Sequence, residues 1–303
     1  MSAARYSLTI EGKEFNVELT NWAEQAHGSV LVRVGDTLVL ATAVMSNTGR
    51  GDGADFFPLT VDYEEKYYAT GKILGSRFVK RETRPSEEAV LVARFIDRSI
   101  RPRFDLRMRN EVQVIITVLS TDGENDPDVL SLFAASLALS LSDIPWAGPV
   151  AGVRVGRKDG AFLLNPVYLD REASDMDVAV SGTRDRINML EAGAHEITEN
   201  DFASAVEWGF KFVQELNAFQ DRIIAAHTPK KRAPLLLAMP PELTSLVKEF
   251  TPRIEKAVYL GADTGANKKS VYDATGQVKD EWMRTAQERY PKVFQKNSAA
   301  YIF

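Results

Sequence analysis

The stretch from Gly71 to Arg103 reads GKILGSRFVKRETRPSEEAVLVARFIDRSIRPR and is the most informative part of this chain. It concentrates positive charge in about a tenth of a protein whose net charge is −5. Its cations are Lys72, Arg77, Lys80, Arg81, Arg84, Arg94, Arg98, Arg101 and Arg103. A basic segment in an otherwise acidic chain is typical of a site for phosphate-rich ligands. The arginines are interleaved with apolar residues at helical spacing, which predicts a loop that runs into a helix.

Outward from this stretch, the apolar periodicity predicts alternating strands and helices. Strands are expected over residues 6–10, 15–19, 29–34, 37–44, 57–63, 111–119, 151–155, 161–164, 177–181 and 187–192. Helices are expected over residues 85–100, 127–141 and 201–226. Asp126 is the expected N-cap of the second helix, and Pro127 its first residue. This order of elements predicts an α+β domain in which helices pack on a mixed sheet.

Residues 228–234, TPKKRAP, interrupt the pattern with charge between two prolines. We expect a solvated linker here rather than a localisation signal. Beyond it, residues 241–250, 251–260 and 277–294 have helical periodicity, and 261–268 are expected to form a loop. The predicted domains are therefore residues 1–230 and a small all-α domain over 231–303.

Composition excludes several classes of protein. With 45% hydrophobic and 26% charged residues, the chain resembles an ordinary globular protein. It has no run of apolar residues that approaches the length of a membrane span. The absence of cysteine rules out disulfides and fits a cytoplasmic location. The three histidines are far apart in sequence and lack metal-ligand spacing.

An ordered series of motifs surrounds the basic stretch. Asp55–Val61 (DFFPLTV) precedes it and Asn110–Val114 (NEVQV) follows it. Further motifs lie at residues 134–141, 148–152, 164–166 and 175–182. Together they closely resemble the first ribonuclease-PH-like core of the bacterial polynucleotide phosphorylase family, over most of residues 1–230. Residues 231–303 resemble the helical linker domain of that family by position and composition.

The resemblance implies a ribonuclease-PH-like fold and a part in RNA degradation. Members of the family are exoribonucleases that degrade single-stranded RNA from 3′ to 5′ with inorganic phosphate, releasing nucleoside diphosphates. They are polyribonucleotide nucleotidyltransferases that use Mg²⁺, form homotrimeric rings and join RNA-degradation complexes in the cytoplasm. Their subunits carry two cores in tandem, and the second core is catalytic. The implied reading of this chain is a non-catalytic first core that guides RNA or supports the ring.

The positions of the family's catalytic motifs are altered here. Asn125-Asp126-Pro127-Asp128 stands where a competent core has a run of serines before a buried helix. Pro127 has no N–H to donate, and the two carboxylates repel phosphate. Asp175 and Asp177 keep the carboxylates of a second motif. However, Ala179 replaces its lysine, and Arg171 aligns with a third acidic position. We therefore predict no catalytic residue in this chain, with Asp175 and Asp177 as degenerate counterparts.

Asp175 and Asp177 also raise the question of a metal site. Residues i and i+2 of a strand face the same side, so the two carboxylates are expected to be neighbours. Two carboxylates without a third ligand bind a divalent cation weakly. We therefore predict a solvated or arginine-paired strand edge and no tightly bound metal.

The resemblance also places an RNA-gripping loop in the basic stretch. Its predicted RNA-binding residues are Arg77, Phe78, Lys80, Arg81 and Arg84. Phe78 is expected to stack on a base and the cations to contact phosphates. The loop is one residue longer than the family's pattern, and Val79 interrupts the paired aromatics. In the alternative reading, Phe78 is a core residue and the arginines pair with neighbouring glutamates.

Two further readings stay open at this point. One is a non-enzymatic protein that binds RNA or scaffolds a ring. The other is a diverged paralogue with its own activity at Asp175 and Asp177. We also expect the chain to be a fragment of a longer protein, because residues 299–303 continue a helical pattern.

Overall fold

The computed structural model describes residues 4–49, 56–73, 84–296, 299 and 302–303. The chain separates into two compact units. The first comprises residues 1–48, 59–106 and 110–234, and the second residues 49–58, 107–109 and 235–303. The predicted domain boundary between residues 230 and 231 stays a prediction.

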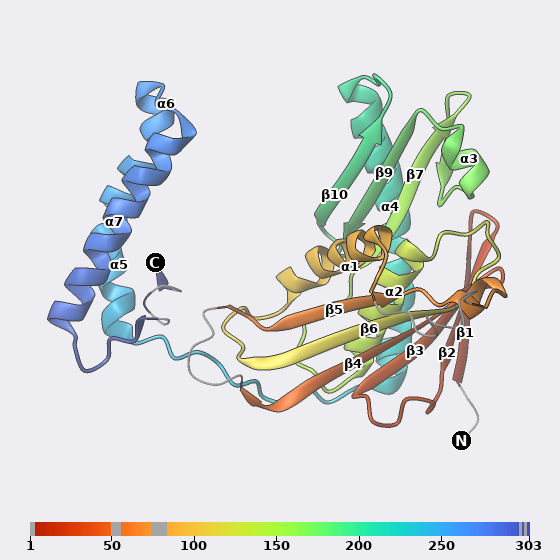
Figure 1. Cartoon of the computed structure of the whole chain (residues 1–303), viewed down its shortest axis with the longest axis horizontal. Helices are drawn as coiled ribbons and strands as arrows, with labels where there is room; N and C mark the ends of the chain where they lie inside the picture. The colour runs from red at the N-terminus through yellow and green to blue at the C-terminus, as the bar shows by residue number, and fades with distance from the viewer. Residues whose placement is uncertain (1–3, 50–55, 74–83, 297–298, 300–301) are drawn as a thin grey trace. The chain divides into compact units, whose positions relative to one another are not determined.

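The first unit contains a six-stranded sheet in the order β1-β2-β3-β4-β6-β5 (Figure 1). Its strands are β1 (Ala4–Ile10), β2 (Lys13–Leu19), β3 (Gly28–Val34), β4 (Thr37–Gly49), β5 (Leu59–Glu64) and β6 (Asn110–Ser120). The pairs β1–β2 and β3–β4 are antiparallel hairpins, and Gly12 and Gly35 supply the positive φ that their tight turns require. Strands β5 and β6 are parallel, which confirms the predicted mixed sheet.

A separate four-stranded antiparallel sheet completes the β-structure of this unit, in the order β10-β9-β7-β8. Its strands are β7 (Ala151–Lys158), β8 (Ala161–Leu164), β9 (Met176–Gly182) and β10 (Ile187–Ala194). Sequence periodicity found these strands but did not show that they form a sheet of their own.

Helix α2 (Pro127–Leu141) is the central helix of this unit, as predicted, with Asp126 as its N-cap. It contacts β3 and β6 of the larger sheet and β7 of the smaller one. Its residues from Asp128 to Ser140 are all buried, because the helix is apolar almost all round. Helix α1 (Glu87–Ile100) packs on β5 and α2, and α4 (Glu199–His227) packs on β7 and β9. Short elements are η1 (Tyr67–Thr70), η2 (Arg101–Arg103) and α3 (Tyr168–Glu172).

The stretch predicted to be a solvated linker is instead attached to the C-terminal end of α2. Lys231 Nζ donates hydrogen bonds to the carbonyl oxygens of Leu139, Ser140 and Ser142, at 2.9, 2.9 and 2.7 Å. Arg232 donates to Asn47 Oδ1 at 2.8 Å. The sequence did not show this attachment, because the unpaired carbonyls at a helix end attract a cation and periodicity does not show which cation is within reach.

The second unit contains α5 (Pro241–Val258), α6 (Leu260–Thr264) and α7 (Lys268–Arg289). Its core is formed mainly by buried residues of α5 and α7, with Trp282 fully buried among them. The predicted break after residue 250 is wrong, since α5 continues through Pro252. Phe250 and Ala257, on either side of the proline, are both buried in the core of this unit. Whether this unit is a separate all-α domain stays a prediction. Among the described residues, no helix is long and apolar enough to cross a membrane.

Candidate functional site

The loop before α2 is held in place by Asp122. Its carboxylate accepts hydrogen bonds from the Glu124 and Asn125 amides at 2.9 and 2.8 Å, and from Thr37 Oγ1 at 3.0 Å. Although partial burial opposes ionisation, these hydrogen bonds keep the pKa of Asp122 well below its usual range. The loop is therefore rigid where it delivers Asp126 to the start of α2.

Two carboxylates occupy the N-terminal turn of α2. Asp126 accepts a hydrogen bond from the Asp128 amide at 3.1 Å, and Asp128 accepts one from the Val129 amide. This is the end of the helix at which the macrodipole favours negative charge. The protein's own side chains thus supply the anion that such a helix end attracts.

Arg154 and Arg171 bind these carboxylates from the opposite side. Arg154, on β7, pairs with Asp128 and, at 2.6 Å, with Asp177. Arg171, on α3, pairs with Asp126 at 2.6 Å and with Asp177 at 2.8 Å. Each arginine bridges two carboxylates from different parts of the chain. We call these five residues the Asp–Arg cluster.

Burial disfavours the charged forms of side chains in the Asp–Arg cluster. The side chains of Arg154 and Asp126 are only 14% and 15% exposed. Burial, together with the charge of Asp128, raises the pKa of Asp126 to about 7 despite the nearby arginines. Burial also disfavours the charge of Arg154, but Asp128 and Asp177 raise the pKa of this guanidinium above its usual value. The cluster holds three carboxylates and two guanidiniums, so it has one acid in excess.

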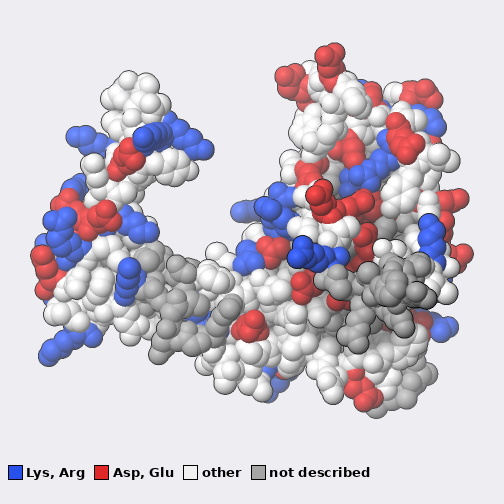
Figure 2. Space-filling view, in the orientation of Figure 1, with Lys and Arg blue, Asp and Glu red and all other residues white. Residues whose placement is uncertain are grey.

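The Asp–Arg cluster lines a cleft of about 250 Å³. The other wall is formed by residues from α1, β9 and β10, namely Glu88, Leu91, Val92, Phe95, Ala179, Glu191, Ala192 and Gly193. Figure 2 shows basic and acidic side chains lying next to one another in the region of α1. The cleft is therefore polar on the α2 side and partly apolar on the α1 side.

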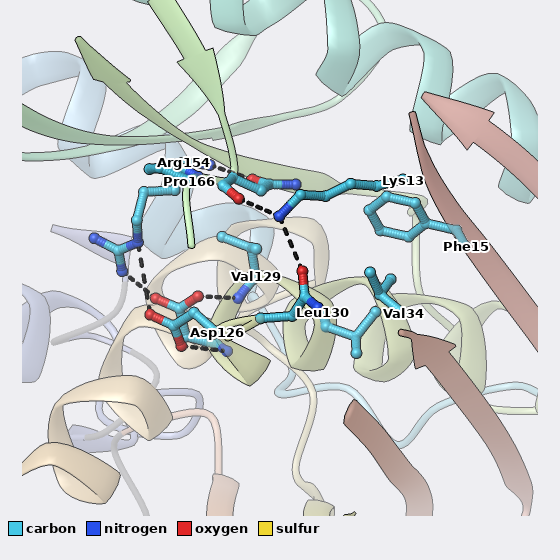
Figure 3. Close-up of a pocket in the computed structure, with 11 residues that line it drawn as sticks. Lys13, Phe15, Val34, Asp126, Val129, Leu130, Arg154 and Pro166 are labelled. Carbon is cyan, nitrogen blue, oxygen red and sulfur yellow. Dashed lines mark hydrogen bonds and ion pairs between the residues drawn. The ribbon is translucent and has the colours of Figure 1, made fainter. Parts of the chain in front are cut away.

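A smaller cavity of about 20 Å³ also borders Asp126 and Arg154 (Figure 3). Lys13 reaches into this region and donates to Asn125 Oδ1 at 2.9 Å and to the Asn165 carbonyl oxygen at 2.5 Å. Partial burial lowers the pKa of Lys13. This lysine supports the loop before α2 rather than facing the larger cleft.

The two aspartates of the degenerate motif have different partners. Asp177 lies on β9 and belongs to the Asp–Arg cluster. Asp175 precedes β9 and pairs with Arg157 at 2.6 Å, and Arg157 also pairs with Asp201 of α4 at 3.2 Å. The two carboxylates therefore bind different arginines, and Asp175 immediately precedes the first residue of β9. The predicted arginine-paired strand edge describes both residues.

The carboxylates of this region do not fit a divalent cation. Among the described residues, no group of three or more His, Asp or Glu side chains could hold a metal ion. Asp126, Asp128 and Asp177 already have guanidinium partners, and Ala179 is buried where the family's lysine is expected. The Mg²⁺ implied by the resemblance therefore has no matching ligand set at this cleft.

Most predicted RNA-binding residues cannot be placed. Arg77, Phe78, Lys80 and Arg81 lie outside the described residues, and Arg84 is exposed shortly before Ser86, the N-cap of α1.

Further along the basic stretch, three arginines have structural partners. Arg98 pairs with Glu191, Arg101 with Asp97, and Arg103 donates to the Ala147 carbonyl oxygen at 2.7 Å. Arg94 is exposed on α1.

Sequence reasoning missed Arg154 altogether. It considered Arg171 only as a residue that stands where the family's motif has an acidic side chain. The usable signal was a lone arginine between the buried Val153 and Val155 of β7. A charged residue flanked by buried valines in a strand needs a buried partner. The sequence could not show that the partners would come from α2 and β9.

Two family models match the sequence of this chain. The model described as "3' exoribonuclease family, domain 1" matches residues 11–145, and "3' exoribonuclease family, domain 2" matches residues 148–211. The chain belongs to the 3′ exoribonuclease family. The first match contains α1 and α2, and the second contains β7, β9 and Arg171, so the Asp–Arg cluster joins the two family domains.

Curated relatives agree with this assignment. A polyribonucleotide nucleotidyltransferase of Heliobacterium modesticaldum is 50% identical over 246 residues, which is 81% of this chain and 34% of the relative. One of Bacillus licheniformis is 44% identical over 283 residues, 93% of this chain and 39% of the relative. This chain thus spans about a third of the length of the curated relatives it matches.

Solved structures share the fold. A chain of the Archaeoglobus fulgidus exosome with RNA bound to the active site matches with a TM-score of 0.55 and 22% identity. The match covers 67% of this chain and 87% of that one. Rice Rrp46 matches with a TM-score of 0.55 and 14% identity, over 73% of this chain and 94% of that one. These likenesses show the ribonuclease-PH-like α+β fold.

Proposed function

We propose that this chain is a non-catalytic, RNA-guiding core of a phosphorolytic exoribonuclease. In that reaction an oxygen of inorganic phosphate attacks the phosphorus of the 3′-terminal phosphodiester. The bond from that phosphorus to the 3′ oxygen of the preceding nucleotide breaks, and a nucleoside diphosphate leaves. The enzyme acts as a homotrimer in the cytoplasm, its Mg²⁺ is held in a second core, and residues 231–303 serve as a linker domain.

The observation that carries the proposal is the Asp–Arg cluster. A site for phosphorolysis must hold the dianionic phosphate and the RNA backbone together, so it needs donors and cations that are not already neutralised. At this cleft both arginines are paired with carboxylates, and Pro127 offers no amide hydrogen. The first turn of α2 thus repels the co-substrate that the reaction consumes.

RNA contact is assigned to the basic stretch on the strength of the family membership and the charge pattern. Arg77, Lys80, Arg81 and Arg84 supply cations for the sugar–phosphate backbone, and Phe78 supplies a face for base stacking. A core that grips RNA without cleaving it delivers the strand to a catalytic core in the same assembly.

Binding of a fluorescent oligoadenylate to the intact chain at several salt concentrations tests this assignment. Lys80→Ala with Arg81→Ala should weaken binding and flatten the slope of log affinity against log salt by about 0.7 per lost contact. Lys268→Ala with Lys269→Ala removes the same charge from an exposed site on α7 and serves as the control.

Phe78→Ala separates stacking from structure in the same experiment. It should cost about 1–3 kcal/mol of binding and leave the salt slope nearly unchanged. Unaltered affinity and slope in the Lys80 and Arg81 double variant would reject the loop as the RNA contact. A Phe78→Ala chain that unfolds would assign this aromatic to the core.

A further inference from the structure

The cleft beside the Asp–Arg cluster carries more negative than positive charge. Its lining contains five carboxylates and two guanidinium groups. The carboxylates are those of Glu88, Asp126, Asp128, Asp177 and Glu191, and the guanidiniums are those of Arg154 and Arg171. Arg98, which lies outside the lining, pairs with Glu191 at 2.5 Å. An excess of two carboxylates therefore remains when all three arginines are counted.

The carboxylates of the cleft also keep unused capacity to accept hydrogen bonds. The two oxygens of Asp177 accept one hydrogen bond each, from Arg154 at 2.6 Å and from Arg171 at 2.8 Å, although a carboxylate can accept about four. Glu88 is exposed and makes no ion pair or hydrogen bond with another described residue. Burial and the charge of Asp128 raise the pKa of Asp126 to about 7, so the arginines do not fully compensate this carboxylate. The cleft therefore lacks a group that is positively charged and rich in donors.

The wall formed by α1 gives the cleft an apolar side. The α1 residues that line it are Glu88, Leu91, Val92 and Phe95. Their spacing places them on one face of the helix over about 10 Å, and Leu91 is 61% exposed. On β9, Ala179 lies two residues from Asp177 and so faces the same side, where its small side chain leaves space. The cleft of about 250 Å³ thus combines carboxylates with an open apolar face.

A linear alkylamine with several ammonium groups matches these features. An ammonium group offers three donors and no acceptor. Unlike a divalent metal ion, it does not require a complete set of oxygen ligands, so the guanidinium partners of the aspartates do not exclude it. The methylene chain between two ammonium groups can lie against apolar surface, as the stem of a lysine does.

We propose that this cleft binds a linear polyamine, with one ammonium group against the carboxylates of the Asp–Arg cluster and another at Glu88. The methylene chain between them lies along Leu91 and Val92 of α1. The proposal goes beyond the proposed function, because it concerns a free small cation and requires no contact with RNA. A lysine side chain of a partner protein shares part of this chemistry, and the titrations distinguish the two.

Calorimetric titration of the intact chain with spermidine, at about pH 8 and above the pKa of Asp126, tests the proposal. Glu88→Gln should weaken binding about tenfold, the effect of one lost charge-assisted hydrogen bond. Glu87→Gln is the matched control, because it changes the net charge equally at a neighbouring exposed glutamate of α1 that does not line the cleft. It should leave the affinity nearly unchanged. Equal losses in the two variants would assign binding to overall charge and overturn the proposal, as would the absence of binding to the native chain.

Ala179→Lys tests the inner end of the cleft. Ala179 is 2% exposed and lines the cleft beside Asp177, so the introduced side chain extends into it. Its ammonium group should occupy the inner position and lower the affinity for spermidine at least about tenfold. Native affinity in a variant shown to be folded by circular dichroism would contradict the proposal. If this variant does not fold, the comparison of Glu88→Gln with Glu87→Gln still decides.

Butylamine separates a polyamine from a single cationic side chain. It carries one ammonium group on a four-carbon chain, as a lysine side chain does, and should bind at least about tenfold more weakly than spermidine. Equal affinity would show that the cleft holds a single cation, such as a lysine of a partner, and would overturn the assignment. The proposed function fails separately, since release of nucleoside diphosphates by the native chain rejects that function whether or not spermidine binds.

Discussion

The two ends of α2 carry different groups that compensate the charge of the helix macrodipole. At the C-terminal end, a single ammonium group on Lys231 donates to three carbonyl oxygens, and its positive charge is the sign that this end favours. At the N-terminal end, Asp126 and Asp128 supply negative charge, but they do so in a cluster with two arginines and a third carboxylate. The C-terminal end is therefore capped by one residue. The N-terminal end belongs to a network of charged residues that lines a cleft.

This difference bears on the proposed function, which rests on the N-terminal end. The Lys231 cap uses one residue, whose ammonium group donates to three neutral carbonyl oxygens. The N-terminal network buries five charged groups where a neutral cap such as serine would satisfy the helix. This buried charge, which goes beyond what a helix end needs, is the feature on which the proposed function rests.

The largest expected effect comes from breaking the network at its centre. Arg154→Met removes the partner of both Asp128 and Asp177 and leaves the buried Asp128 without its ion pair. It should lower the free energy of unfolding by about 3–5 kcal/mol in urea denaturation. Arg157→Met is the control on the same strand, and its loss should be far smaller because its partners Asp175 and Asp201 are 45% and 43% exposed. Equal losses would refute the distinction between the two arginines.

The cap at the other end predicts a smaller loss. Lys231→Met leaves the carbonyl oxygens of Leu139, Ser140 and Ser142 without their shared donor. The free energy of unfolding should fall by about 1–3 kcal/mol. Lys230→Met changes the neighbouring exposed lysine in the same way and should have almost no effect. A loss for Lys230→Met as large as for Lys231→Met would show that the stretch acts through charge alone.

Much of the fold followed from the sequence, and the site followed only in part. Helix α2 and its cap at Asp126 were predicted correctly, because a proline at the first helical position and an apolar run are local signals. The separation of β7–β10 into a second sheet was not predicted, since strand pairing depends on contacts that are distant in sequence.

The same limit applied to the charged residues. Asp126 and Asp128 are predicted from the sequence to repel phosphate, and in the structure both belong to the Asp–Arg cluster. Arg154 and Lys231 were missed as partners, because each meets α2 only after the chain has folded. In the sequence, Arg154 is a lone arginine between valines and Lys231 is a lysine in a polar linker. Neither pattern indicates which group the side chain contacts.

The N-terminal end is also expected to make the stability of the chain depend on pH. Burial and Asp128 raise the pKa of Asp126 to about 7, so the folded chain holds a proton there that the unfolded chain releases near pH 4. The associated stability is present below about pH 4 and is lost as the pH rises through 7. The charged groups facing Asp126 are Asp128, Asp177, Arg154 and Arg171.

Asp126→Asn removes this titration. The variant should not lose this stability between about pH 5 and pH 8, and at pH 8 it should be more stable than the native chain. Urea denaturation at both pH values measures the difference. A variant that loses stability with rising pH as steeply as the native chain would place the proton elsewhere.

The central claim is that the cleft at the start of α2 does not carry out phosphorolysis. The most direct measurement is the release of nucleoside diphosphates from polyadenylate by the purified chain, with inorganic phosphate and Mg²⁺. Our account predicts no release above background, and the same result for Asp177→Ala, because this carboxylate is an arginine partner and not a catalytic group. Turnover that survives purification and disappears in Asp177→Ala would contradict the account and identify the Asp–Arg cluster as a working active site.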